Sequence, residues 1–310
     1  NNCENKLIEQ ALLSEKINCA FYDLNLNNLT QTLIEKKAEI LVFEDNFKGV
    51  GISVKSEGLM HDKFCIFDKN VIMTGSFNPT YNGNFKNNNN IIFIESKTLA
   101  NNYLKEFEEL KTRKEQKTKE TILKYNGFII KNYFCPEDNC KQKVIKELKL
   151  AKKSIYFMTF SFTDKDIGNI LITKNKEILV KGVMEKKRIN MKYNLFNYLN
   201  QSRINVLTDN NPYTMHHKVF IIDEEIVITG SYNPTKNGDE KNDENILIIH
   251  DKNVAKEYLE EFERIAWIFV DLKLEMEKYI YTLIKINLWN IKKYFFMIIN
   301  LMRKIYETWT

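Results

Sequence analysis

The same polar side chains recur in the same order at two places in this chain. In each place a histidine and a lysine two residues apart precede an aspartate, and a Gly-Ser-x-Asn segment follows; the copies lie 155 residues apart. Side chains two residues apart in a β-strand lie on one face of it. The spacing therefore predicts that each copy gathers an imidazole, an ammonium, a hydroxyl and a carboxamide at one strand end. The residues are His61, Lys63, Asp68, Ser76 and Asn78 in the first copy and His216, Lys218, Asp223, Ser231 and Asn233 in the second.

These residue types suit the chemistry of a phosphate diester. Lysine supplies charge-assisted donors to the non-bridging oxygens, and the asparagine amide and serine hydroxyl add neutral donors. Such donors stabilise the charge that spreads over the oxygens in the transition state. A neutral histidine can attack phosphorus, and a protonated one can give its proton to the leaving alkoxide. This chemistry needs two histidines in opposite protonation states, and the duplication supplies two.

No metal ion or other cofactor is expected at these residues. A lysine two residues from a histidine makes a poor metal site because the ammonium repels cations. The other two histidines, His217 and His250, form no ligand cluster. Strand alternation also turns His217 away from the face that carries His216 and Lys218.

A single motif of this kind could arise by chance. A structural duplication would need to keep only its apolar positions and its turn residues. Both copies here also keep histidine, lysine, serine and asparagine at matching positions. The presence of these polar side chains in both copies indicates that they serve catalysis.

At these residues the chain resembles the phospholipase D superfamily. The pattern H-x-K-x4-D followed by G-S-x-N occurs in both copies, and the resemblance covers residues 1–265. It implies two similar α/β repeats about a pseudo-twofold axis, with both motifs in one active site at their interface, so that a monomer can be active. It also implies a phosphohistidine intermediate without a metal. Asp68 and Asp223 would be supporting carboxylates, more structural than chemical. The continuations "GSFNPT" and "GSYNPT" are most similar to the small nuclease-type branch.

One position differs between the copies. In the nuclease-type branch, a glutamate eleven residues after the motif asparagine hydrogen-bonds the motif histidine. Glu244 stands there in the second copy and Asn89 in the first. A carboxylate partner stabilises imidazolium more than an amide does. We therefore expect Glu244 to pair with His216, as the proton donor, and Asn89 to leave His61 neutral, as the nucleophile. Drift at a tolerant position is the alternative.

Helices and strands are expected to alternate in each copy, which predicts an α/β fold. Identical "EILV" strands at 39–42 and 177–180 lie 138 residues apart. The second copy would then hold 17 extra residues (155 − 138) before its histidine, including an added helix in "INMKYNLFNYLN". The expected domains are a first repeat at 1–112, a charged linker at 113–127, a second repeat at 128–266 and an amphipathic helical tail at 267–310. Because "YFCPED" precedes "NC" only in the second copy, we expect the first repeat to be truncated at its N-terminus.

Composition sets few further limits. The 310 residues have room for two domains, and 44% hydrophobic and 28% charged residues are ordinary for a globular protein. A net charge of +5 permits an anionic partner without requiring one. The five cysteines are too few for a disulfide scaffold and too scattered for a zinc ribbon. Cys135 and Cys140 form either a bridge in an exported protein or two reduced thiols.

The composition changes after residue 265. All three tryptophans lie there, apolar residues recur every three or four positions, and lysines and arginines surround them. The apolar run between Lys293 and Arg303 is far shorter than the ~20 residues that span a bilayer. Two interpretations stay open: a basic amphipathic helix on an anionic membrane surface, or a helix packed on its own domain or on a partner.

The motif defines the reaction and leaves the diester open. Short loops, the basic balance and the nuclease-like run to Glu244 favour a nuclease acting on nucleic acid, which we place first. The aromatic and basic tail favours a phospholipase D or phosphatidyltransferase acting on phospholipids, which we place second. The third interpretation is a non-catalytic scaffold that binds a membrane or partner through its tail. Membrane association and export are both compatible with the sequence.

Overall fold

The computed structural model describes residues 3–114, 118, 121–125, 127–266, 299 and 301–302 of the chain. Two compact units are distinguished, Asn1–Ala266 and Trp267–Thr310, and only the first is described further. The helical tail predicted at 267–310 lies almost wholly outside the described residues. Within the described part, no helix is both long enough and apolar enough to cross a bilayer.

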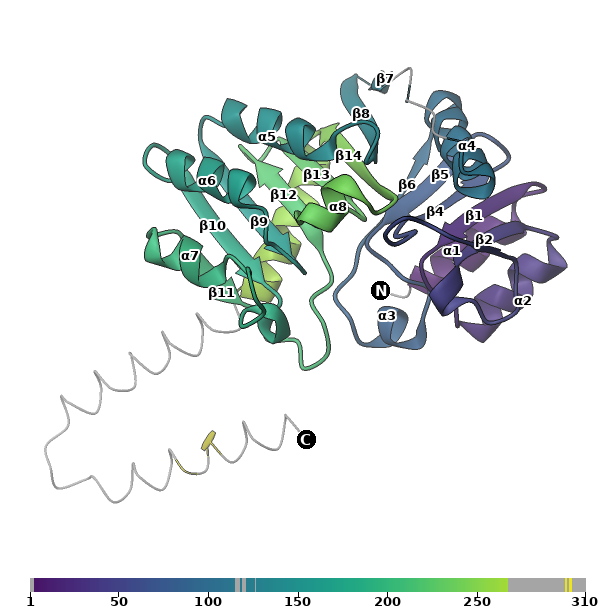
Figure 1. The fold of residues 1–310 in the computed structure, drawn as a ribbon, viewed down its shortest axis with the longest axis horizontal. Coiled ribbons are helices and arrows are strands. Elements are labelled where there is room, and N and C mark those ends of the chain that lie inside the picture. Colours follow the sequence, from purple (N-terminus) through teal and green to yellow (C-terminus); the bar gives the residue numbers. More distant parts are fainter. Residues whose placement is uncertain are drawn as a thin grey trace, which may run out of the picture. The chain divides into compact units, whose positions relative to one another are not determined.

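The first repeat is built on a six-stranded mixed sheet, drawn in purple and blue in Figure 1. The three strands at one edge run parallel to one another, and the other three follow as an antiparallel meander. In spatial order the strands are β3 (Ile52–Val54), β2 (Glu39–Phe43), β1 (Ile17–Phe21), β4 (Lys63–Phe67), β5 (Val71–Gly75) and β6 (Ile91–Glu95).

The second repeat has an eight-stranded sheet, whose first six strands repeat this order. Two further antiparallel strands extend it at the β14 edge. The spatial order is β11 (Asn205–Thr208), β10 (Leu179–Met184), β9 (Ser154–Thr159), β12 (Lys218–Ile222), β13 (Ile226–Gly230), β14 (Glu244–His250), β8 (Phe128–Cys135) and β7 (Ile122–Tyr125). The predicted α/β fold with two similar repeats is therefore confirmed.

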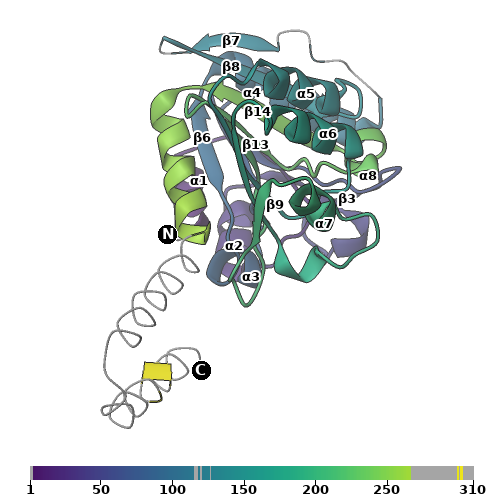
Figure 2. The ribbon, with the colours of Figure 1, turned by 90° about the vertical axis from the view of Figure 1, so that its left-hand side faces the viewer.

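Helices cover both faces of each sheet, as alternating apolar side chains require. In β1, Cys19 and Phe21 face the helices of one side, whereas Ala20 faces the helix of the other. On the first sheet, one face is covered by α1 (Cys3–Leu12) and α2 (Asn27–Glu35), and the other by α4 (Lys97–Thr112). On the second sheet, one face is covered by α5 (Cys140–Leu150), α6 (Lys165–Lys174) and α7 (Phe196–Gln201), and the other by a helix over 252–266. Figure 2 shows α5 and α6 side by side. The short ones are α3 (Tyr81–Phe85), α8 (Lys236–Glu240), η1 (Glu44–Asn46) and η2 (Lys186–Arg188).

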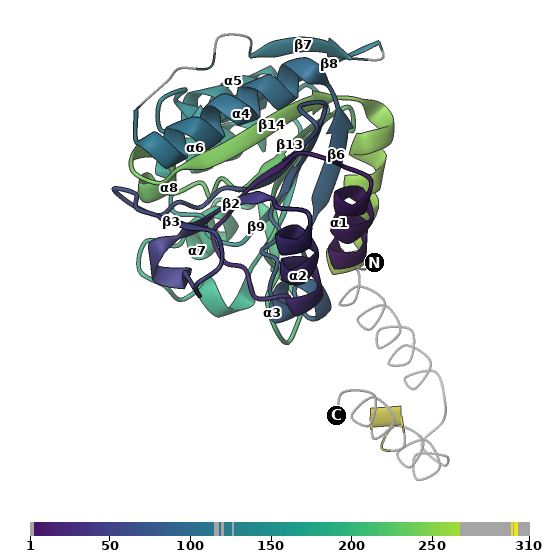
Figure 3. The same cartoon turned by 90° about the vertical axis from the view of Figure 1, so that its right-hand side faces the viewer.

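Helix α4 joins the two repeats. Its buried residues Leu99 and Phe107 share one core with Phe64 of the first sheet and with Ile130 and Leu247 of the second. Figure 3 shows α4 alongside β14. The two sheets are thus fixed to one another by a common hydrophobic core.

Two predictions about the second repeat need correction. The strand pairing places Lys181 of β10, not Glu177, where Glu39 stands in β2, so the two "EILV" runs are not equivalent. Four apolar residues suit any buried strand, and an identical tetrapeptide does not determine register. The added helix is present but shorter than predicted, since α7 covers only Phe196–Gln201.

The structure contains two disulfides. Cys135–Cys140 closes the loop between β8 and α5, which is the bridged alternative considered from the sequence. Cys19–Cys65 links directly opposed residues of β1 and β4, and this bridge was not predicted from the sequence.

Candidate active site

Backbone pairing between the repeats fixes both motif histidines. The amide of His61 donates to the carbonyl of Asp243 at 2.9 Å, and the amide of His216 donates to that of Asn88 at 2.9 Å. An isolated β-bridge precedes each histidine: Met60 pairs with Asp243, and Met215 pairs with Asn88. Each histidine therefore lies at the interface, held by a segment of the other repeat.

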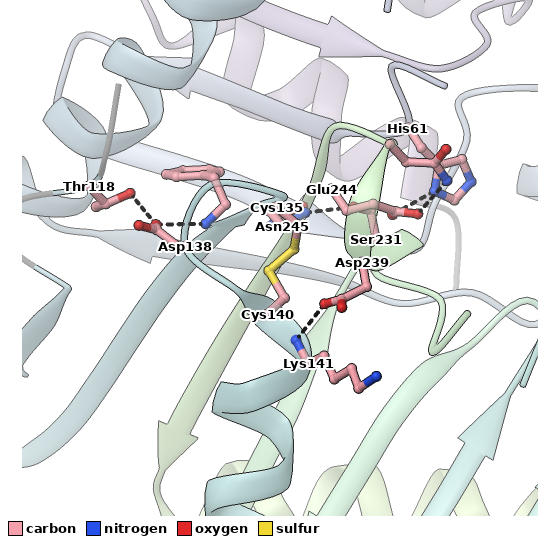
Figure 4. The surroundings of a disulfide bond; sticks show 12 residues. His61, Thr118, Cys135, Asp138, Cys140, Lys141, Ser231, Asp239, Glu244 and Asn245 are labelled. Carbon is pink, nitrogen blue, oxygen red and sulfur yellow. Dashed lines mark hydrogen bonds and ion pairs between the residues drawn. A yellow bond between two sulfur atoms is a disulfide. The ribbon is translucent and has the colours of Figure 1, made fainter. Parts of the chain in front are cut away.

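The acceptors of the two imidazoles also come from the other repeat. His61 Nδ1 lies 2.7 Å from Glu244 Oε2, as Figure 4 shows. His216 Nδ1 lies 3.2 Å from Asn89 Oδ1 and 3.0 Å from the carbonyl oxygen of Ser76. The predicted pairing of Glu244 with His216 is wrong. The bridges described above place Glu244 and Asn89 each beside the histidine of the other repeat.

Both motif lysines are buried beside the histidines. Lys218 Nζ donates to the carbonyl oxygen of His216 at 2.9 Å, and Lys63 Nζ donates to that of His61. An aromatic ring flanks each pair: Lys63 lies 5.1 Å from the ring centre of Tyr22, and Lys218 lies 4.8 Å from that of Phe160. The structure therefore brings both predicted His-Lys pairs into one site.

Tyr22 and Phe160 were missed by the sequence analysis. Their rings also meet the imidazoles edge-on, with centroids 5.1 Å from His61 and 4.6 Å from His216. Each follows an apolar strand at equivalent places in the two repeats, and this shared position is the signal that could have revealed them.

Burial and mutual repulsion favour the neutral forms of the bases. Burial first, then the ammonium groups of Lys63 and Lys218, lowers the pKa of both His61 and His216 well below the ordinary value. Burial likewise lowers the pKa of Lys63 to about 7 and raises that of Glu244 to about 7. Since Nδ1 of each ring faces oxygen acceptors, we assign the ring proton to Nδ1. Nε2 of each ring then carries the lone pair.

The motif serines orient other groups. Ser76 Oγ donates to Asn90 Oδ1 at 2.9 Å and accepts from the Asn90 amide at 3.1 Å. Ser231 Oγ accepts from the Asn245 amide at 2.9 Å, and its hydroxyl bonds to Glu244. The prediction that these hydroxyls donate to a phosphate is therefore not supported, because their protons already have protein acceptors.

The glycine before each serine permits this arrangement. A Cβ atom on Gly75 would lie 2.3 Å from the carbonyl oxygen of Asn90, and one on Gly230 would lie 2.2 Å from that of Asn245. Glycine is the residue that allows two backbones to approach so closely. The Gly-Ser turn thus brings β5 against β6, and β13 against β14, at the edge of the site.

The motif asparagines remain candidates for substrate contact. The carboxamide oxygens of Asn78 and Asn233 are buried, and neither has a hydrogen-bond partner among the described residues. A buried polar atom without a partner costs free energy, so such atoms often mark a functional site.

The motif aspartates lie away from the site. Asp68 and Asp223 start the tight turns after β4 and β12, with φ of 51° and 55°. Asp68 accepts from the amides of Glu15 and Lys16 at 2.9 and 2.8 Å. Asp223 accepts from three successive amides, starting at Lys152, at 2.6 to 3.0 Å. The resemblance implied supporting carboxylates, more structural than chemical, and these contacts with backbone amides fit that role.

Asp223→Ala is expected to reduce stability and leave the chemistry unchanged. Losing charge-assisted bonds to three amides should lower the free energy of unfolding by about 2–3 kcal/mol. Asp223→Asn keeps an acceptor and tolerates the positive φ, so it should recover roughly half of this loss. Urea denaturation and kcat/KM on a soluble diester test both points. A loss of turnover without a loss of stability would return Asp223 to the catalytic set.

A second crossed network lies behind the site and was also missed. Asn245 Nδ2 donates to Thr74 Oγ1 at 2.9 Å and to Tyr103 Oη at 2.8 Å. Asn90 makes the matching bonds to Thr229 and Tyr258 at 2.8 Å each. Each asparagine bonds the other repeat, which holds the two halves of the site in register. The identical spacing of Asn, Thr and Tyr in both copies was the available signal.

Comparison with known proteins identifies the family of this chain. The family model described as "Cardiolipin synthase, PLD-like domain" matches residues 9–111 and 144–267. A "Phospholipase D" of Rickettsia typhi is 34% identical over 128 residues, which cover 41% of this chain and 63% of that protein. The chain thus spans less than two thirds of the length of this curated relative.

Two solved structures are also similar. Nuc from Salmonella typhimurium, a phospholipase D family member, shares 31% identity over 44% of this chain and 92% of its own, with a TM-score of 0.42. Phosphatidylserine synthase of Haemophilus influenzae shares the fold over 85% of this chain and 83% of its own, with 11% identity and a TM-score of 0.63. Because the family model matches both repeats and well over half of the residues, this chain belongs to the phospholipase D superfamily, whose members act on phosphodiesters.

Proposed function

We propose that this protein hydrolyses phosphodiester bonds through a phosphohistidine on His61. The observation that carries the proposal is the unequal pair of imidazole partners, Glu244 for His61 and Asn89 for His216. When His61 Nε2 attacks phosphorus, the ring becomes cationic, and the Glu244 carboxylate offsets that charge. This is the role of the aspartate beside the histidine of a serine hydrolase. His61 was also expected from the sequence to be the nucleophile, but there because an amide partner would leave it neutral. Here the reason is its carboxylate partner, Glu244.

The remaining steps use His216. The P–O bond to the leaving group breaks, and the leaving oxygen takes a proton from Nε2 of protonated His216. Neutral His216 then accepts a proton from a water molecule as the water oxygen attacks the phosphohistidine. The P–N bond breaks, which returns both histidines to their starting states. An amide partner leaves His216 a stronger acid than a carboxylate partner would, which suits proton donation.

The lysines supply the positive charge for the phosphate. Both are buried, and burial lowers the pKa of each. A phosphodiester anion between them would favour their protonated forms and would favour imidazolium at His216 as well. The proposed chemistry therefore needs no metal ion, because two ammonium groups stabilise the transition-state charge.

For the substrate we propose a single-stranded nucleic acid. A basic-aromatic cluster of Tyr81, Lys86, Lys187, Arg188 and Tyr213 adjoins the His216 side of the site. Lys86 Nζ lies 5.3 and 4.6 Å from the rings of Tyr81 and Tyr213, which are 58% and 45% exposed. Lys187 donates to the carbonyl oxygen of Tyr213. Exposed rings between cations suit bases that stack and phosphates that pair.

Arg188 connects this cluster to the site. Its guanidinium lies 3.9 Å from the ring centre of Phe160, the ring that also flanks His216 and Lys218. A strand bound along the basic-aromatic cluster would thus lead towards the two imidazoles.

Phospholipid is the second candidate substrate. The relative from Rickettsia typhi carries the name phospholipase D. Exposed Met191 and Tyr193, next to η2, could also contact a lipid surface, because apolar and aromatic side chains enter the interfacial region.

Hydrolysis in EDTA distinguishes these candidates. We expect cleavage of a labelled single-stranded oligonucleotide, with affinity falling steeply as salt rises. Lys86→Gln should weaken binding and reduce the slope of log K against log salt by roughly 0.7. Lys252→Gln is the matched control, since Lys252 pairs with Glu225 beside the turn at the far end of β12. Turnover of phospholipid vesicles alone would assign the lipid, and loss of all turnover in EDTA would contradict the mechanism.

A further inference from the structure

Both repeats have a glutamate at one position behind the site, but the side chains around it differ in charge between the repeats. In the second repeat Glu261 lies between a histidine and an arginine: its Oε1 is 2.9 Å from His217 Nε2, and its Oε2 is 2.6 Å from Arg264 Nε. These contacts lower the pKa of Glu261 to about 2, against the opposing effect of burial. The carboxylate is therefore ionised and balanced by protein groups.

In the first repeat both balancing groups are replaced by acids. At the same spacing of 155 residues, Glu106 corresponds to Glu261, Asp62 to His217 and Glu109 to Arg264. The core residues around them correspond as well, since Tyr103 and Tyr258 make equivalent bonds to Asn245 and Asn90. The glutamate is thus present in both repeats, whereas the histidine and arginine beside it in the second repeat are acids in the first.

A fourth acid comes from the other repeat. Glu137 lies in the loop closed by the Cys135–Cys140 disulfide, between β8 and α5. One carboxylate oxygen each from Glu106, Glu109 and Glu137 fall within 4.8 Å of one another. Oxygens bound to one Ca²⁺ at about 2.4 Å can lie at most about 4.8 Å apart, so the spacing suits an ion of that size.

Unpartnered buried oxygens point to a ligand independently of this clustering. Glu137 is 9% exposed, and its Oε1 is buried without a hydrogen-bond partner among the described residues. Asp62 is 0% exposed, and neither of its carboxylate oxygens has one. Asn245 Oδ1, the counterpart of the oxygen that faces His217, is unpartnered too. Several kcal/mol of desolvation would remain uncompensated for a carboxylate in this position.

We propose that Glu106, Glu109 and Glu137 bind one divalent cation of the Ca²⁺ type. Carboxylate oxygens are the ligands such hard ions prefer, and the cluster found among the described residues holds no histidine or cysteine. The ion takes the place of His217 and Arg264, which contact Glu261 in the second repeat. Asp62 interacts electrostatically with both Glu106 and Glu137, so it lies near the same cluster.

The bound ion would join the repeats. Glu106 and Glu109 belong to α4, whereas Glu137 belongs to the disulfide loop of the second repeat. Cys135 of that loop pairs directly with Glu244 in the adjacent strand β14, and Figure 4 shows the disulfide beside it. By holding this loop, the ion therefore stabilises the strand pairing that positions Glu244. It takes no part in the proposed chemistry, so turnover measured well below the melting temperature should withstand EDTA.

Calcium binding to the full chain tests the proposal. After EDTA treatment and its removal, equilibrium dialysis should show one saturable Ca²⁺ per chain, and the melting temperature should rise with occupancy. Glu137→Gln and Glu106→Gln should weaken binding at least tenfold. Glu108→Gln is the matched control, because it makes the same change at an exposed residue of α4.

The direction of the change in melting temperature in EDTA distinguishes ion binding from a merely structural role. Without an ion, Glu137→Gln removes a buried acid whose Oε1 has no partner among the described residues, so it should melt at or above the wild-type temperature in EDTA and fail to gain from calcium. Absence of saturable binding to the wild type would overturn the proposal. So would equal calcium affinity in Glu137→Gln and Glu108→Gln.

Discussion

His61→Ala is expected to abolish both turnover and the covalent phosphoenzyme. Removing the nucleophile of a covalent mechanism costs about 10⁵–10⁶-fold in kcat. Rapid quench with a ³²P-labelled diester measures the intermediate, and steady-state hydrolysis measures turnover. Both signals should fall to background.

His216→Ala should separate the two steps. A diester with a good leaving group needs no proton donor, so this variant should still form the phosphoenzyme and should then hydrolyse it slowly. Labelled protein should accumulate in a burst. His250→Ala, which removes a partly exposed imidazole outside the site, is the control and should behave as the wild type. A trapped phosphoenzyme that survives His61→Ala would reverse the two roles.

The sequence could identify the reacting residues because the chain is duplicated. His61, Lys63 and their counterparts recur with the same spacing, and the period of a β-strand places each pair on one face. The structure brings both pairs to one interface, as the resemblance implied. Local spacing was sufficient for these residues because their relative position depends on a single strand.

The partners of the histidines could not be predicted in this way. Whether Glu244 reaches His216 or His61 depends on how two distant segments pair across the interface, and nothing in either motif encodes this. The same limit explains the buried Cys19–Cys65 bridge, which depends on the register of β1 against β4. Asp68 was expected to be more structural than chemical, and its carboxylate accepts from the amides of Glu15 and Lys16 at the turn after β4.

Glu244→Gln is expected to lower kcat by about 10²–10⁴-fold. Glutamine keeps the shape of the side chain, loses the charge that stabilises the phosphohistidine, and can hold the imidazole in the wrong tautomer. Asn89→Ala is the comparison at the equivalent position. It should cost less than about tenfold, because His216 Nδ1 keeps the carbonyl oxygen of Ser76 as an acceptor at 3.0 Å. Equal losses in the two variants would contradict a special role for the carboxylate.

The pH profile distinguishes this positioning role from a loss of structure. Burial raises the pKa of Glu244 to about 7, so wild-type activity should fall as pH drops below that value and protonates the carboxylate. Burial lowers the pKa of Lys63 to about 7, so activity should also fall as pH rises and removes the ammonium. The wild type should therefore show a narrow maximum near neutral pH, with limbs that belong to the coupled pair. In Glu244→Gln the acid limb should move to lower pH, towards the titration of His61. The alkaline limb should move to lower pH as well, because Lys63 loses the carboxylate that raises its pKa. A variant that was merely misfolded would lose amplitude and keep both limbs in place.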